Sequence, residues 1–166
     1  MLKKSSNPYG KCWKGVFEAR NPNKYVGKEA AIFRSRLERK VMSALDTSPH
    51  VLQWASEQPL IPYIHPVRTL QEGKQVVWNY HPDFLIKLTD GNKTWIELVE
   101  IKPAKQTKAP LPWGKGRSKK LAEYEAQTYA VNIAKWERAI QLCEQNGWKF
   151  RIVTEQTVDS YIRSIL

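Results

Sequence analysis

Two short stretches of this chain place acidic and basic residues among apolar neighbours in a pattern that could do chemistry. They are Pro82-Asp83 and Glu100-Ile101-Lys102. Two carboxylates brought together in a protein interior repel each other and lose hydration, and a divalent cation relieves both costs. Mg²⁺ prefers a few carboxylate oxygens together with water and phosphate oxygens. With a lysine beside the metal to orient water or stabilise negative charge, these residue types suit hydrolysis of a phosphodiester.

A β-hairpin is the element that would bring the two stretches together. Residues 75–88 and 93–101 are rich in β-branched and aromatic side chains, which predicts two strands. Asp90-Gly91 lies between them and is a strong signal for a tight turn. The sequence therefore predicts an antiparallel pair in which the strand that contains Asp83 runs alongside the strand that contains Glu100.

Within the second strand, residues two apart point to the same face, so Glu100 and Lys102 should share one side of the sheet. The carbonyl oxygen of Ile101 is then available as a further metal ligand. Taken alone, the same residues also fit a solvent-facing pair of charges and an aspartate that caps a turn. The pattern is too short to decide between these readings without its context.

The remaining periodicities predict a helix-first α/β domain. Gly147 follows the longest of the predicted helices, where a helix commonly ends. We expect residues 1–25 to form an irregular basic arm and residues 26–166 a single domain. The expected order is α-β-β-β-α-β-α, with helices at 29–45, 118–145 and 157–165, further strands at 57–65 and 148–155, and a turn at 70–74.

The charge balance indicates a polyanionic partner. The chain has 27 lysines and arginines against 16 acidic residues, a formal net charge of +11, and nucleic acid is the commonest partner of such a protein. Proline and glycine make residues 102–120 a loop that displays its charges. The residues of this segment that we expect to contact DNA phosphates are Lys105, Lys108, Lys115, Arg117, Lys119 and Lys120.

Composition also excludes several classes of protein. No apolar run approaches the roughly 18 residues that a membrane-spanning helix needs. The basic N-terminus lacks the apolar segment of a secretory signal, so we expect a cytosolic protein with two reduced cysteines. The two cysteines and three scattered histidines offer no zinc-type cluster.

The pattern Pro82-Asp83…Glu100-Ile101-Lys102, together with the order of elements, resembles the PD-(D/E)xK nuclease superfamily. The resemblance implies a restriction-endonuclease-like core, in which helices flank a mixed central β-sheet. It also implies that Asp83 and Glu100 bind Mg²⁺, with Mn²⁺ as an alternative, and that Lys102 positions or activates water. Glu38 matches the glutamate of the first core helix that often joins the metal site in this superfamily.

A narrower resemblance covers roughly residues 14–158. The segments that carry it are IFRSRLERKVM, VLQWASEQPLIPYIHPV, YHPDFLIKL, EIKPAKQTKAP and YAVNIAKWERAIQLCEQNGWKFRIVTE, and together they resemble the head completion nucleases of tailed bacteriophages. That family implies Mg²⁺-dependent hydrolysis of packaged double-stranded DNA during virion assembly, before the head joins the tail. The implied partners are head or portal vertex proteins, and the implied location is the host cytoplasm, with retention in the virion left open.

Three weaker predictions and two other functions remain at this stage. Glu57 could lie near the metal, Gln127 could reach the site from the long helix, and His81 could shape the site from beside Pro82. A transposase-type endonuclease subunit shares the same core but is normally longer. A non-catalytic DNA-binding adaptor in head assembly would need the charge excess alone. The sequence leaves open the oligomeric state and whether cleavage is endonucleolytic only or also exonucleolytic.

Overall fold

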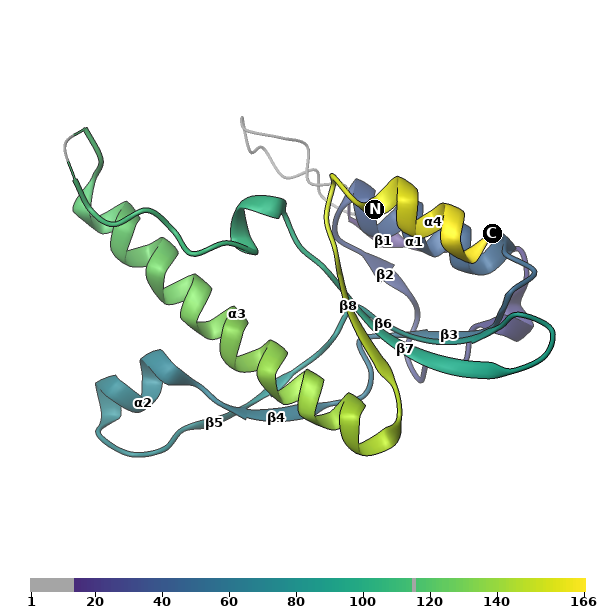
Figure 1. Cartoon of the computed structure of the whole chain (residues 1–166), viewed down its shortest axis with the longest axis horizontal. Helices are drawn as coiled ribbons and strands as arrows, with labels where there is room; N and C mark the ends of the chain where they lie inside the picture. The colour runs from purple at the N-terminus through teal and green to yellow at the C-terminus, as the bar shows by residue number, and fades with distance from the viewer. Residues whose placement is uncertain (1–13, 115) are drawn as a thin grey trace.

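The computed structural model describes residues 14–114 and 116–166, and at its centre is a four-stranded sheet (Figure 1). In the order β3-β6-β7-β8, β6 pairs antiparallel with both β3 and β7, whereas β8 joins β7 in parallel. The predicted mixed central sheet flanked by helices is confirmed. The bounds of its strands are β3 Val51–Ser56, β6 Phe84–Thr89, β7 Thr94–Ile101 and β8 Lys149–Val153.

The predicted hairpin forms between β6 and β7. In its turn the Asp90 carboxylate accepts hydrogen bonds from the backbone N–H groups of Asn92 and Lys93, and Gly91 adopts a φ of +91°. A positive φ is readily reached only by glycine, so the Asp90-Gly91 signal has its expected physical origin. The register sets Phe84 opposite Val99, which carries Asp83 to the level of the C-terminal end of β7.

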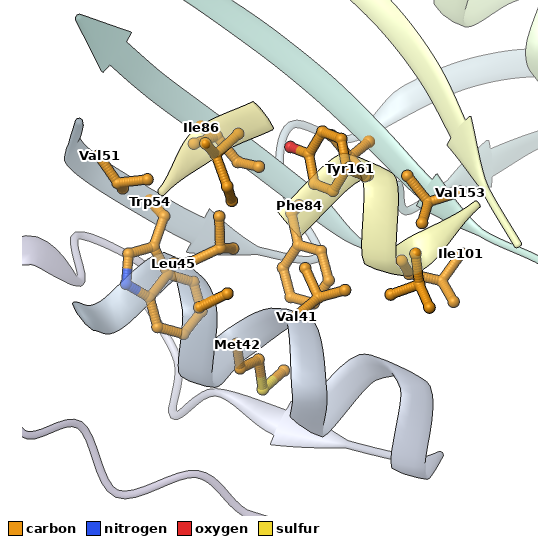
Figure 2. Packing of buried hydrophobic residues seen from close by; sticks show 14 of the residues in the cluster. Val41, Met42, Leu45, Val51, Trp54, Phe84, Ile86, Ile101, Val153 and Tyr161 are labelled. Atoms are coloured by element: carbon orange, nitrogen blue, oxygen red, sulfur yellow. The ribbon is translucent and has the colours of Figure 1, made fainter. Parts of the chain in front are cut away.

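One face of the sheet is covered by α1 (Arg36–Thr47) and α4 (Val158–Ile165). Figure 2 shows Val41 and Leu45 of α1 packed with Phe84 of β6, and these side chains are at most 1% exposed. α1 begins after Ser35, whose hydroxyl accepts from the backbone N–H of Glu38. The predicted start at residue 29 is wrong because residues 32–33 form a strand instead.

The other face is covered by α3 (Lys119–Asn146), which ends at Gly147 with a φ of +67°, close to the predicted end. Beside it lies a two-stranded antiparallel ribbon of β4 (Ile61–Ile64) and β5 (Val77–Tyr80), joined by α2 (Pro66–Glu72). These elements enclose a second core with β7. Its buried members are Ile61, Tyr63, Tyr80, Leu98, Ala139 and Cys143.

The strand predicted over residues 75–88 is in fact two strands in different sheets. Pro82 has no N–H to continue a ladder, and the chain turns there from the ribbon into the central sheet. The strand predicted over 57–65 contains β4 but starts too early, because β3 ends at residue 56 and β4 begins only at residue 61. Glu57 has a φ of +56°, which ends β3. The turn predicted at 70–74 is the end of α2, which Gly73 closes with a φ of +64°.

The described part of the predicted basic arm packs on the domain, whereas residues 1–13 lie outside the described residues. β1 (Gly15–Val16) pairs with β2 (Ile32–Phe33), and a short 3₁₀ helix, η1, follows at Pro22–Lys24. The buried carboxylate of Asp46 accepts hydrogen bonds from the backbone N–H groups of Arg20 and Asn21. Among the described helices none is long and apolar enough to cross a membrane.

Candidate active site

Asp83 lies against the C-terminal end of the neighbouring strand β7. Its Oδ2 accepts a hydrogen bond from the backbone N–H of Ile101 at 2.6 Å. The turn at Pro82 is what places it there, because Asp83 is the last residue before β6 and faces the end of its partner strand. The structure therefore brings together the two stretches that the sequence predicted to meet.

Glu100 is the most enclosed group of the site, with 2% of its surface exposed. Its Oε1 lies 2.7 Å from the Nζ of Lys102, as expected for two side chains on one face of a strand. Its Oε2 accepts a hydrogen bond of 2.6 Å from the hydroxyl of Tyr80. Both oxygens of this buried carboxylate are thus paired, one with a cation and one with a neutral donor.

The two carboxylates alter the acid–base properties of the site. Burial raises the pKa of Asp83, and the negative charge of Glu100 raises it further, against the smaller opposing effects of the Ile101 N–H and of Lys102. Burial of the Lys102 ammonium acts to lower its pKa, but Glu100 and Asp83 outweigh that effect and raise it. Lys102 is therefore protonated, which favours a role in orienting water or stabilising charge over a role as a base.

Glu38 serves the start of α1 and contributes to the field of the site. Its Oε2 accepts from the backbone N–H of Arg34 at 2.7 Å and its Oε1 from the hydroxyl of Ser35 at 2.9 Å. Together with the Ser35 cap, these bonds form a variant of the capping box in which Glu38 accepts from the N–H of Arg34 rather than from that of Ser35. The charge of Glu38 acts, as a small contribution, to raise the pKa of both Asp83 and Lys102.

Glu57 and Arg34 connect this helix start to the aspartate. The Arg34 guanidinium pairs with the Glu57 carboxylate, and the backbone N–H of Glu57 donates to the carbonyl oxygen of Asp83 at 3.2 Å. The hydrogen bond to Glu57 raises the pKa of Arg34, with further contributions from Glu38 and Asp83. The sequence prediction named Glu57 but missed the arginine that it holds.

Two further predicted residues do not join this group. His81 precedes Pro82 and is exposed, and it lines a hollow on the side of Glu57. Gln127 is exposed on α3. On the same helix Asn132 is buried instead, with an amide nitrogen that has no hydrogen-bond acceptor among the described residues.

Tyr80 is a residue of the site that sequence reasoning missed, and Lys135 lies over its ring. Tyr80 is 3% exposed and bonds to Glu100, and the Nζ of Lys135 lies 5.8 Å from the centre of its ring. A signal for Lys135 existed, because it stands four residues before Ala139 in the buried stripe of a predicted helix. A lysine in such a stripe is unusual without a partner or a function.

The predicted DNA-contacting residues differ in how free they are. Lys105, Lys108 and Lys120 are exposed on the loop 102–118 and the start of α3. Lys119 lies 3.8 Å from Glu123, whereas Arg117 is paired with Glu125 and donates to a carbonyl oxygen of its own loop. Lys115 lies outside the described residues. This loop and α3 enclose a cavity of about 480 Å³.

The donor set fits Mg²⁺ better than a transition metal. Asp83 and Glu100 present carboxylates side by side, with the backbone of Ile101 between them. Among the residues that the structure describes, no three histidine, cysteine or acidic side chains gather into a metal-binding group. Mg²⁺ needs no such cage, because it is commonly held by one or two carboxylates while water and substrate phosphate complete its coordination. A metal bound to Glu100 would share that carboxylate with Lys102.

Comparisons with known proteins identify nucleases that this chain is similar to. The model of the family described as the TnsA-like endonuclease N-terminal domain matches residues 48–155, a span that includes Asp83, Glu100 and Lys102. The head completion nuclease of Enterobacteria phage T4 is 35% identical over 146 residues, which cover 86% of this chain and 91% of that protein.

Proposed function

Because this chain belongs to the family of TnsA-like endonucleases and phage head completion nucleases, we propose that Asp83, Glu100 and Lys102 form its catalytic centre. The chain is a nuclease of this family. Its proposed reaction is Mg²⁺-dependent hydrolysis of phosphodiester bonds in double-stranded DNA, with Mn²⁺ as an alternative metal. The observation that carries the proposal is the meeting of two carboxylates and a lysine at the end of β7.

Each residue has a proposed part in the reaction. Mg²⁺ would bind Asp83, Glu100 and the Ile101 carbonyl oxygen, and would lower the pKa of a bound water and offset charge on the phosphate. Lys102, held protonated by the two carboxylates, stabilises the negative charge that develops on the phosphate oxygens. Glu38 would join the metal through a bound water, because both of its carboxylate oxygens are engaged at the start of α1.

The proposed substrate is DNA packaged in a phage head, cut before the head joins the tail. The exposed lysines of the basic loop follow directly after the catalytic strand, so they can hold the backbone next to the bond that is cut. Head or portal vertex proteins are the proposed partners, and the host cytoplasm is the proposed compartment. The relative that is named a head completion nuclease supports this role.

Cleavage of linear and circular duplex DNA by the purified protein tests the proposal. We expect cutting with Mg²⁺ or Mn²⁺ and none with EDTA, and we expect Asp83→Ala and Lys102→Ala to bind DNA without cutting it. Lys93→Ala is a matched control, because Lys93 is exposed in the turn at the opposite end of β7. A wild-type protein that binds DNA but cuts no substrate with any metal would favour the non-catalytic adaptor instead.

A further inference from the structure

Lys135 of α3 is a partly buried cation that forms no ion pair with the acidic residues that the structure describes. Its Nζ lies 5.7 Å and 5.8 Å from the ring centres of Tyr63 and Tyr80, both of which are 3% exposed. Among the described residues no carboxylate lies within ion-pair distance of this nitrogen. A buried charge is costly unless it is paired, and no described carboxylate forms an ion pair with Lys135, so an anion from outside the chain would stabilise it.

The position of Lys135 along α3 points to the catalytic centre. Ala139, one turn further along the same face, packs with Leu98 of β7 in the second core. Because α3 connects the end of β7 to the start of the parallel strand β8, it runs antiparallel to β7, and one turn toward its N-terminus leads toward Glu100 and Lys102. In agreement, burial first and then the charge of Lys102 lower the pKa of Lys135, while Glu100 and Asp83 act to raise it.

Tyr80 connects this cation to the catalytic carboxylate. Its ring faces Lys135, while its hydroxyl donates to Glu100. Burial, and then the charge of Glu100, raise the pKa of that hydroxyl, which keeps it a donor. Tyr63 lies on β4 and Tyr80 on β5 of the ribbon. The faces of these two aromatic rings attract the Lys135 ammonium and hold it near Tyr80.

We propose that Lys135 binds a backbone phosphate of the DNA at the catalytic centre, and that Tyr80 positions both Lys135 and Glu100. This inference rests on the proposed nuclease function and names a second cation for its substrate. The phosphate supplies the anion that Lys135 lacks. Lys135 reaches the site from α3 and Lys102 reaches it from β7, so the negative charge that develops during hydrolysis meets positive charge from two elements.

A comparison of two lysines that each lie over an aromatic ring tests the role of Lys135. Lys135→Gln should lower kcat/KM for cleavage by about 10²-fold, the usual effect of losing one charge-stabilising donor, and Lys135→Arg should restore part of it. Lys149→Gln is the matched control, because Lys149 lies 5.0 Å from the Trp95 ring centre, is exposed and stands at the other end of the sheet. Equal losses in the two glutamine variants, or no loss in Lys135→Gln, would overturn the proposal.

DNA with single uncharged linkages tests whether Lys135 contacts a backbone phosphate. The substrates are a series of short duplexes, and each has one phosphate near the mapped cut replaced by an uncharged methylphosphonate. If Lys135 holds a phosphate, one member should be cut equally slowly by the wild type and by Lys135→Gln, because the contact is already lost. If the two proteins differ by the same factor on every member, Lys135 does not bind a backbone phosphate.

Tyr80→Phe separates positioning from mere packing. The ring and its contact with Lys135 remain, but the hydrogen bond to Glu100 is lost. We expect kcat to fall and the Mg²⁺ concentration for half-maximal rate to rise, with the KM for DNA unchanged. An unchanged metal dependence would show that Tyr80 does not position Glu100.

DNA binding measured in EDTA separates this inference from the proposed nuclease function. If the wild type cuts no DNA, the nuclease proposal fails, but weaker DNA binding by Lys135→Gln than by the wild type still supports the phosphate contact. Equal binding by the two proteins overturns it.

Discussion

Glu97 and Glu100 lie on the same strand, β7, and 3% and 2% of their surfaces are exposed. Because side chains alternate along a strand, Glu97 points toward the face covered by α1 and α4, and Glu100 toward the face covered by α3. Both carboxylates are bound to a basic side chain, Arg151 for Glu97 and Lys102 for Glu100. Burial and pairing therefore do not distinguish them.

The difference lies in the second oxygen and in the neighbouring acid. The Glu97 carboxylate accepts hydrogen bonds from the Nε1–H of Trp95 at 3.0 Å and from the Nε–H of Arg151 at 2.9 Å, so both of its oxygens have donors within the fold. Glu100 also has two donors, but Asp83 stands beside it with a raised pKa. The two neighbouring acids repel each other, and a bound divalent cation would offset that repulsion. Repulsion between acids is thus the better sign of function here.

The largest expected difference between the two glutamates is in cleavage. Glu100→Gln should reduce the cleavage rate by at least about 10²-fold, because it removes a proposed metal ligand and its charge. Glu97→Gln should stay within about threefold of wild type, because it lies across the sheet from the reacting groups. Rates are measured on one linear duplex at saturating Mg²⁺. Equal losses in the two variants would mean that the comparison between the faces is wrong.

Glu97 should matter for the stability of the fold rather than for cleavage. Glu97→Leu leaves the Nε1 of Trp95 and part of Arg151 without an acceptor, and such losses cost about 1–3 kcal/mol. Because half of the Arg151 side chain is exposed, water can replace part of its pairing, and the lower end of this range is expected. Urea unfolding measures the change, with cleavage activity of the folded variant as the control. A loss of activity larger than the loss of folded protein would contradict a purely structural role for Glu97.

The raised pKa of Asp83 predicts how pH acts on stability without metal. The folded chain keeps the Asp83 proton at pH values where the unfolded chain has released it, so stability falls as pH rises from the ordinary carboxyl pKa through the raised one. Asp83→Asn removes that dependence and should be the more stable protein in EDTA at pH 9, by on the order of 1 kcal/mol or more. At pH 4 the two should unfold at nearly the same urea concentration.

Mg²⁺ provides the control for this pH effect. Added Mg²⁺ should narrow the gap between wild type and Asp83→Asn at pH 9, because the metal offsets the repulsion between the carboxylates. A gap of equal size at pH 4 and pH 9 would indicate a packing effect rather than the titration of Asp83.

Local signals made much of this fold predictable. Asp90-Gly91 marked the hairpin through a turn that needs a positive φ, and Gly147 marked the end of α3 for the same reason. The residue alternation in Glu100-Ile101-Lys102 correctly placed its two charges on one face, where they form an ion pair. These predictions depend on a few neighbouring residues, and tertiary packing did not override them.

The rest depended on contacts between distant segments. Residues 75–88 have the composition of one continuous strand, and only the tertiary structure shows that the chain passes from one sheet to another at Pro82. Ser35 and Glu38 spell a capping box, and this overlooked signal would have moved the start of α1 from residue 29 to its observed place. Lys135 has only the weak signal of a lysine on the buried stripe of a helix, because its partners Tyr63 and Tyr80 come from a ribbon that the sequence did not predict.

The smallest expected effect comes from a charge that is neither buried nor paired with an acid. Lys108 is exposed on the basic loop, and Lys108→Ala should weaken DNA binding and reduce the slope of log Kd against log salt by about one unit, as for one phosphate contact. Lys93→Ala, which removes an exposed charge at the far end of β7, should leave the slope unchanged. Fluorescence anisotropy in EDTA between low and moderate salt measures both.

Salt then separates this exposed charge from the buried ones. Screening acts strongly on exposed charges and weakly on buried ones, so the difference between Lys108→Ala and wild type should shrink as salt rises. The cleavage defect of Glu100→Gln should persist at every salt concentration, because Glu100 is enclosed between β5 and Lys102. If the Lys108→Ala defect instead persisted at high salt, Lys108 would act through a specific contact, and the basic loop would belong to the catalytic centre rather than to its electrostatic surroundings.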